Sequence, residues 1–281
     1  MISIIIPVRF RADLTQVCID SILLYTKNFE LIVVQEGEDE EVRNLLLETY
    51  YPRFDSMFVD YEKFRTERQK RKEVKESEKS RGGEFVMGSY PYDNDSEPRL
   101  KYVQNKVPKG YAGALNAGLS IATGDYYCFM NNDTVVTPGW MDEMLKAFED
   151  KDVGLVSPTF WGTGDRQSVD WNNGDQFDNV LDPTSIIGVC YLISKECMYK
   201  VGVWDESFGH GGEDFDMTIR VQNADYKLVI ARRAFIYHYG GASTRIVIGN
   251  DLDKVRKNQM EKIMMVETKH GIDIRSKFIQ K

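Results

Sequence analysis

A short apolar run in this chain leads directly into two amides and a carboxylate. The run reads FMNNDT at residues 129–134. Residues 126–130 are apolar enough to form an interior strand, so Asn131, Asn132 and Asp133 would follow at the open edge of a sheet. Oxygen ligands of this kind bind Mg²⁺ or Mn²⁺, usually together with phosphate oxygens. The structural alternative is an ordinary Asn/Asp turn that leads into a capped helix.

Other polar segments also follow apolar or glycine-rich runs. Two β-rich runs near the N-terminus each precede a helical pattern, which predicts a parallel sheet with a nucleotide at its carboxyl edge. Small residues in a later run would let a helix N-terminus approach the sheet and phosphate groups closely. The segments are SIIIPV at 3–8, ELIVVQEG at 30–37, GYAGALNAG at 110–118, ATGD at 122–125, GEDFD at 212–216 and YHYGG at 237–241.

The elements that must position these segments are predicted by hydrophobic periodicity. The pattern indicates an α/β fold in which helices flank a mostly parallel central sheet. Asp13 is expected to cap the first helix, and Gly271 to end the last one. Strands are predicted at 2–8, 31–34, 100–103, 126–130, 153–157, 186–194, 228–231 and 235–237. Helices are predicted at 13–25, 39–51, 110–122, 138–150, 195–201, 214–221 and 251–270, and a loop at 161–183.

One segment does not fit the pattern of a packed core. Residues 62–81 contain nine Lys/Arg, five Asp/Glu and only two large apolar residues, Phe64 and Val74, so they cannot bury a face. The segment is either a solvated charged helix or mobile loop, or a basic flap over an anionic acceptor or a membrane surface. We expect residues 1–245 to form one domain with this insertion at about 54–98, and residues 246–281 a helical extension packed on it.

The composition limits the classes of partner and compartment. A chain of 281 residues with 42% hydrophobic residues suits one large α/β domain or two small ones. Its net charge of −8 argues against bulk binding to nucleic acid or anionic membrane. The four cysteines lack metal or disulfide spacing and are expected to be buried free thiols. Without a leader or an apolar stretch of spanning length, we expect a cytoplasmic protein, with peripheral membrane association left open.

In their order and spacing, the segments resemble the family 2 glycosyltransferases, which are inverting enzymes of the GT-A fold that use nucleotide sugars. The resemblance covers residues 1–52 and about 99–245. It implies metal-assisted single displacement of a sugar from a nucleoside diphosphate to a hydroxyl of a glycan, polysaccharide or other glycoconjugate. UDP-sugars are favoured as donors, with dTDP- and GDP-sugars as alternatives.

The resemblance also implies a role for each polar segment. Asp133 matches the last residue of the family's Asp-X-Asp motif and, with His238, would bind Mn²⁺ or Mg²⁺. Asn131 replaces the first Asp of that motif. Asp214, beside Glu213, matches the catalytic base, and a position at a helix start would lower its pKa. The structural alternatives are a helix cap for the acidic pair and a structural role for the lone histidine.

Donor and acceptor contacts follow from the same matches. Glu36 would accept a hydrogen bond from the nucleobase, although an acidic helix cap is an alternative. Three tryptophans offer faces on which a sugar ring could stack. The proposed donor contacts are Pro7, Val8, Glu36, Gly110, Asn116, Asn131 and Asn132, and the proposed acceptor contacts are Trp161, Trp171 and Trp204.

Two rival functions stay open at this point. A sugar nucleotidyltransferase would need a glycine-rich, basic phosphate loop after the first strand, and the sequence PVRFR at 7–11 is not one. A non-catalytic carbohydrate-binding or scaffold protein on the same fold is expected to lose the base or the metal ligand. Asp133, Asp214 and His238 are all present, which favours the enzyme.

Overall fold

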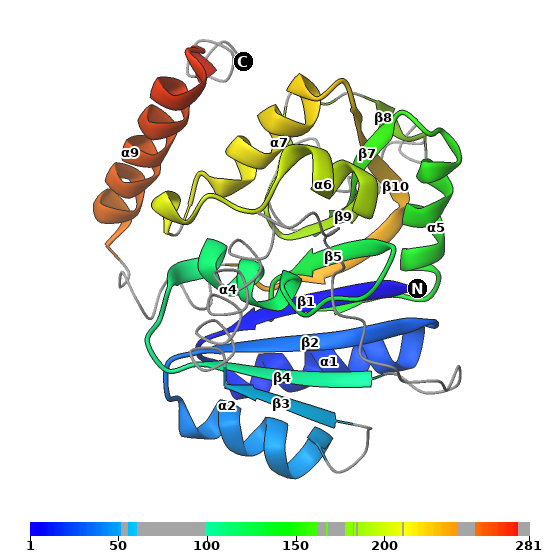
Figure 1. Cartoon of the computed structure of the whole chain (residues 1–281), viewed down its shortest axis with the longest axis vertical. Coiled ribbons are helices and arrows are strands. Elements are labelled where there is room, and N and C mark those ends of the chain that lie inside the picture. Colours follow the sequence, from blue (N-terminus) through cyan, green and yellow to red (C-terminus); the bar gives the residue numbers. More distant parts are fainter. Residues whose placement is uncertain are drawn as a thin grey trace, which may run out of the picture.

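One mixed sheet runs through the protein, with helices packed against both of its faces (Figure 1). The computed structural model describes residues 1–51, 56–60, 99–161, 167, 178–181, 183, 185–209, 211–240 and 251–274. The charged segment 62–81, Trp171 and most of the predicted loop 161–183 lie outside these residues.

The sheet changes character at its middle. The first five strands, β1 to β5, pair in parallel; they are β1 Ile2–Val8, β2 Phe29–Glu36, β3 Ser56–Asp60, β4 Arg99–Asn105 and β5 Tyr126–Met130. β9, Cys190–Ser194, then lies antiparallel between β5 and β7, Val153–Phe160. β10, Lys227–His238, pairs in parallel with β7 and antiparallel with β6, Thr134–Val136, and β8, Val180–Leu181. The order is β3-β4-β2-β1-β5-β9-β7-β10-β6.

The helices divide between the two faces of the sheet. Residues of α1 and α5 share one apolar core with one face of β1, whereas residues of α4, α6 and α7 share a second core with the other face. The helices are α1 Ala12–Tyr25, α2 Glu40–Asn44, α4 Gly110–Leu119, α5 Trp140–Lys146, α6 Lys195–Val201, α7 Glu213–Asn223 and α9 Leu252–His270. Shorter helical turns are η1 Leu45–Tyr50, η3 Ala147–Glu149 and η4 Glu206–Phe208.

The small residues of α4 allow it to lie very close to the sheet. A Cβ added at Gly118 would come within 2.4 Å of Ile5 Cγ2 and 3.2 Å of Val34 Cγ2. Such distances exclude any side chain larger than hydrogen unless the helix moves outward. The glycine and alanine pattern therefore sets the height of α4 above β1 and β2, as expected from the sequence.

Several boundaries differ from those predicted. Asp13 does not cap α1: Arg11 holds the N-cap position with φ 69°, and Asp13 instead binds the Arg11 guanidinium from the first turn. The two strands predicted at 228–231 and 235–237 form one strand, β10, whose register on β7 shifts between Ala231 and Phe235. The strand predicted at 186–194 begins only at Cys190. β6 and β3 were not predicted; β3 lies within the presumed insertion and pairs with β4.

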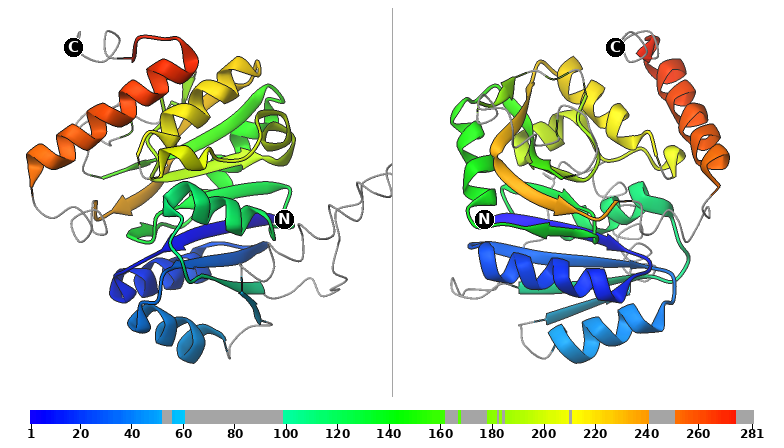
Figure 2. Two further views of the ribbon diagram at one scale, coloured as in Figure 1. Left: turned by 60° about the vertical axis from the view of Figure 1, so that its left-hand side comes forward. Right: turned by 180° about the vertical axis from the view of Figure 1, so that it is seen from behind.

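α9 follows the core and lies beside α7, as both views in Figure 2 show. It ends at Gly271, which has φ 64° and donates its N–H to the Glu267 carbonyl, as the sequence predicted. Val266 of α9 is buried against Phe208 and Ile274. Among the described residues, no helix combines the length and apolar character needed to cross a bilayer. All four cysteines are buried free thiols.

A buried ion pair joins β2 to β4 at the amino edge of the sheet, opposite the edge where the polar segments emerge. Glu30 is fully buried, and Lys101 Nζ lies 2.5 Å from its Oε2. The other Glu30 oxygen accepts from the Ser3 hydroxyl and the Thr123 N–H. The buried carboxylate therefore has two hydrogen-bond donors on one oxygen and a cation beside the other.

We predict that Lys101→Met lowers the free energy of unfolding by about 3 kcal/mol, because an unpaired carboxylate is then left buried. Adding Glu30→Gln should recover part of the loss, since the remaining group is neutral. Urea unfolding followed by circular dichroism measures both. Lys146→Met, which breaks the exposed pair with Glu143, is the control and should cost less than about 1 kcal/mol. Equal losses for the two lysine variants would contradict the prediction.

Candidate active site

Asp133 and His238 meet because β6 pairs with the end of β10. The register places His238 opposite Thr134, and the Tyr239 N–H donates to the Asp133 carbonyl, 3.0 Å away. His238 Nε2 then lies 3.2 Å from Asp133 Oδ1, with both side chains about nine-tenths buried. The two atoms are not aligned as a hydrogen bond, so Nε2 is left without a hydrogen-bond partner among the described residues.

This unaligned contact fits a shared cation. Two ligands bound to one ion at about 2.1 Å and at a right angle are themselves roughly 3 Å apart. The imidazole nitrogen and carboxylate oxygen have that spacing, and both carry lone pairs. No third His, Cys, Asp or Glu joins them within the described ranges. A cation here would complete its coordination with phosphate oxygens and water, as Mg²⁺ sites commonly do.

The backbone at Asn131 and a set of polar contacts connect this pair to the region of Asp214. Asn131, two residues before Asp133, accepts on Oδ1 from the Tyr111 hydroxyl at 2.9 Å. The same hydroxyl lies 3.4 Å from the Gly188 carbonyl oxygen, and the Gly188 N–H donates to Asp214 Oδ2 at 3.3 Å. The β5 tip, the N-terminus of α4, the turn before β9 and the start of α7 therefore meet in one region.

Burial controls the charge state of the acidic pair. Burial, and then the neighbouring Asp214 charge, raise the pKa of Glu213 to about 8. Burial also raises the pKa of Asp214, although the Phe215 and Gly188 N–H groups partly oppose it. The expectation that the helix start would lower the pKa of Asp214 is therefore wrong, because loss of solvent outweighs the backbone donors. Two neighbouring carboxyl groups with raised pKa values favour a state in which the pair carries one negative charge.

Glu36 is held by the N-terminus of α4. Its carboxylate accepts from the Asn105 amide and from the N–H groups of Lys109 and Gly110, the latter two at 2.6 and 3.1 Å. Burial raises its pKa, and these donors partly oppose the shift. This is a cap, as the structural alternative required, but on α4 and not on the helix that follows Glu36. Contact with a nucleobase stays a prediction.

Other residues that were predicted to contact the sugar donor hold loops in place. Gly110 has φ 77°, and a Cβ there would lie 2.6 Å from the Gly209 carbonyl oxygen. The Asn116 side chain bonds both backbone groups of Trp204, each at 2.9 Å. Asn132 donates to Phe10 O and Thr15 Oγ1, which fixes the loop after β1. Pro7 and Val8 are buried at the carboxyl end of β1, opposite Val34 and Gln35.

The tryptophans differ sharply in exposure. Trp204 is 1% exposed, stacked on Tyr191 and edge-on to Phe129, so the predicted stacking of a sugar on it is wrong. Trp161 is 55% exposed and lines a hollow of about 350 Å³ beside His238. The other lining residues are Val17, Val135, Tyr237 and Tyr239.

Sequence reasoning missed two residues that connect the site. Tyr111 sits inside the glycine-rich run but has no motif of its own. The local sequence shows only that Tyr111 follows a glycine, Gly110, which the structure places at the first residue of α4 with a positive φ. Gly188 was assigned to a strand, whereas the turn in which Val189 N–H bonds Ile187 O leaves the Gly188 N–H facing Asp214. Both contacts join residues far apart in sequence.

The comparisons with known proteins agree with this architecture. The family model described as glycosyl transferase family 2 matches residues 90–202. The O-antigen biosynthesis protein RfbC of Myxococcus xanthus is 23% identical over 87% of this chain. The match spans only 18% of the length of RfbC. An uncharacterized protein of Mycobacterium bovis, Mb1552, is 29% identical over 47% of this chain and 54% of its own length.

Two solved structures share the fold. A mannosyltransferase, PcManGT from Pyrobaculum calidifontis in complex with GDP-Man and Mn²⁺, superposes with a TM-score of 0.58 at 15% identity, covering 91% of this chain and 64% of that one. GalNAc-T7 with UDP, GalNAc and Mn²⁺ gives a TM-score of 0.56 at 13% identity, covering 85% and 43%. With the sheet order described above, these findings show a chain with the GT-A fold whose residues 90–202 match glycosyl transferase family 2.

Proposed function

We propose that this protein transfers a sugar from a nucleoside diphosphate sugar to an acceptor hydroxyl, with inversion at the anomeric carbon. The observation that carries the proposal is the connected path from Asp133 and His238 through Tyr111 and Gly188 to Asp214. A transfer needs charge neutralisation on the leaving diphosphate beside a group that removes a proton. The two ends of the path supply one candidate for each.

Asp133 and His238 are the proposed ligands for Mn²⁺ or Mg²⁺. Such an ion, when bound, stabilises the negative charge that develops on the leaving diphosphate. Both similar structures contain Mn²⁺ with a nucleotide or nucleotide sugar, which supports the choice of a divalent ion. Asn131 stands in place of the first carboxylate of the motif, and its amide oxygen accepts from Tyr111.

Asp214 is the proposed base. It accepts the proton of the acceptor hydroxyl while that oxygen forms a bond to the anomeric carbon. The bond from the anomeric carbon to the diphosphate oxygen breaks, and the diphosphate leaves with the electron pair. The N–H groups of Phe215 and Gly188 fix the carboxylate in place, at 2.9 and 3.3 Å. The raised pKa of Glu213 favours a state in which the pair carries a single negative charge, available to Asp214 as the proposed base.

For the nucleobase of the sugar donor and for the acceptor molecule, we propose only a chemical class. The similar structures contain GDP-Man in one case and UDP in the other, so they do not choose between the UDP-sugar we favour and its alternatives. Trp161 and the tyrosines around the hollow beside His238 are the proposed surface for a glycan or glycoconjugate acceptor. A thermal-shift screen of UDP, GDP and dTDP with and without Mn²⁺ identifies the base, because a ligand of the folded state raises Tm.

Asp214→Asn should reduce transfer by at least about 100-fold, since an amide cannot take the proton. Nucleotide binding in the presence of Mn²⁺ should stay within about twofold, because the proposed ligands lie on other elements. Product formation and calorimetric titration measure the two effects. Asp225→Asn, at an exposed residue after α7, is the matched control. Near-normal turnover of Asp214→Asn would refute the assignment of Asp214 as the base. Nucleotide binding without turnover in the unmodified protein would favour the non-catalytic scaffold function.

Asp133→Ala and His238→Ala should each weaken Mn²⁺-dependent nucleotide binding at least about tenfold, through loss of one of two protein ligands. Titration of UDP and GDP with and without Mn²⁺ measures the change. Asp152→Ala, which removes an exposed carboxylate near Lys227, should leave binding unchanged. An unaltered metal dependence in both site variants would rule out the ligand assignment.

Glu213→Gln should flatten the pH dependence of stability. The folded pKa of about 8 lies above the ordinary 4.5, so this group stabilises the fold fully below about pH 4.5 and loses that contribution as pH rises toward 8. The fall in Tm between pH 5 and pH 8 should be smaller in the variant by roughly 3 °C or more. Glu196→Gln, at an exposed glutamate on α6, should retain the full fall. Equal slopes in all three proteins would count against a buried, protonated Glu213.

A further inference from the structure

The middle of α9 lies directly on the loop that leads into the acidic pair. A Cβ added at Gly212 would meet Lys262 Cβ at 3.2 Å and the Lys262 carbonyl oxygen at 3.4 Å. The Lys262 ammonium donates to the Phe208 carbonyl, at the other end of the same loop. α9 therefore contacts the chain immediately before Glu213.

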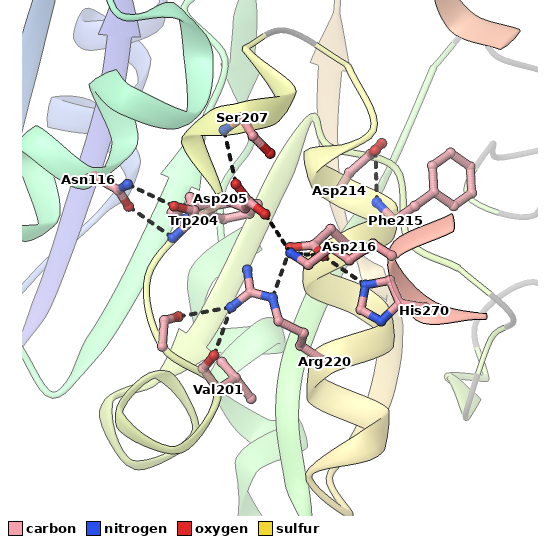
Figure 3. A network of polar contacts seen from close by, with 12 residues as sticks. Asn116, Val201, Trp204, Asp205, Ser207, Asp214, Phe215, Asp216, Arg220 and His270 are labelled. Atoms are coloured by element: carbon pink, nitrogen blue, oxygen red, sulfur yellow. Dashed lines mark hydrogen bonds and ion pairs between the residues drawn. The ribbon is translucent and has the colours of Figure 1, made fainter. Parts of the chain in front are cut away.

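The end of α9 holds the chain immediately after Asp214. Lys269 Nζ lies 2.7 Å from Asp216 Oδ1, and His270 Nε2 lies 2.8 Å from the same oxygen. Asp216 is fully buried, and its other oxygen accepts from Arg220 Nε at 2.9 Å. Figure 3 shows Asp216 between Arg220 and His270, in the first turn of the helix that carries Asp214.

The contact at Asp216 is also tied to the loop that precedes the pair. Lys269 Nζ lies 2.6 Å from Asp205 Oδ2, and Asp205 Oδ1 accepts from the Ser207 N–H. Although burial raises the pKa of Asp216, the hydrogen bonds from Lys269 and His270 outweigh it and hold the pKa below its usual range. A buried carboxylate kept ionised in this way has few other positions available without losing its donors.

We propose that α9 positions the catalytic turn, with Lys269 and His270 acting through Asp216 and Lys262 acting through Gly212. This inference rests on the proposed function, because it assigns the C-terminal helix to the support of the proposed base Asp214. The apolar contact of Val266 with Phe208 and Ile274 anchors the helix, whereas the polar contacts fix the two flanks of the acidic pair. Lys269 and His270 are positioning residues and touch no substrate.

The proposal predicts a selective loss. When Lys269 and His270 are removed, Asp216 keeps only Arg220, and the first turn of α7 can shift toward solvent. Displacement of a catalytic group by about 1 Å can cost up to about 100-fold in rate. Donor binding should be spared, because Asp133 and His238 are placed by the pairing of β6 with β10. The expected signature is a fall in kcat with an unchanged KM for the donor.

The test compares Lys269→Met, His270→Ala and their double variant with Arg256→Ala, which removes an exposed cation from the same helix. The double variant should lose at least about tenfold in kcat, with donor KM and Mn²⁺-dependent nucleotide Kd within about twofold. Lys269→Arg, which keeps a cation, should retain most of the rate. Full kcat in the double variant, or equal losses in kcat and nucleotide affinity, would overturn the proposal.

Hydrogen exchange separates this proposal from the proposed function. In the double variant, the amides of residues 211–216 should exchange faster, while those of β1 and β5 keep their protection. Faster exchange throughout the sheet would indicate a global loss of stability and would overturn the proposal. If the double variant does not fold, the same comparison is made between Lys269→Met and Lys269→Arg. If the unmodified protein transfers no sugar, the proposed function fails, but the exchange pattern still decides whether α9 holds this turn.

Discussion

The pairing of β6 with the end of β10 is the constraint on which the candidate site depends. It takes the turn after a strand at the centre of the sheet and fixes it beside the last strand of the core. Asp133 and His238 are 105 residues apart in the chain, and backbone hydrogen bonds bring their side chains to 3.2 Å. Side-chain attraction is not required to gather these two groups, because the sheet does it before any ion arrives. Such preorganisation lowers the cost of binding a divalent cation.

Four carboxylates lie at the N-termini of α4 and α7, and each has a different set of polar partners. Glu36 accepts backbone N–H groups at the start of α4, whereas Asp216 is neutralised by cations from α7 and α9. Glu213 has an oxygen without a hydrogen-bond partner among the described residues and keeps its proton instead. Asp214 accepts from the backbone N–H groups of Phe215 and Gly188. Among the described residues no cation pairs with Asp214, so no ion pair there competes with an incoming proton.

The sequence was informative where the physical signal is local. Apolar runs located β1, β2, β4 and β5, and the polar residues after them marked the edge where the site forms. The predicted Trp204 contact failed because the ring packs on Tyr191 and on Phe129, and Phe129 lies on a strand that is distant in the chain. Asp13 failed as a cap because Arg11 adopts a left-handed conformation that residue preferences do not favour. Tyr111, Gly188 and the contacts of α9 could not be predicted, since each depends on where two distant segments meet.

The direct contact between Gly110 and Gly209 has a mechanical consequence. The Tyr111 N–H donates to the Gly209 carbonyl at 2.9 Å, with no side chain between the two backbones to absorb movement. α4 is held at the same end by Glu36, and Gly209 leads into the acidic pair through a run of positive-φ glycines. A displacement of the α4 N-terminus would therefore move the Gly209 backbone and, through it, the segment that leads to Glu213. The N-terminus of α4 and the loop before the acidic pair are therefore coupled directly through their peptide groups.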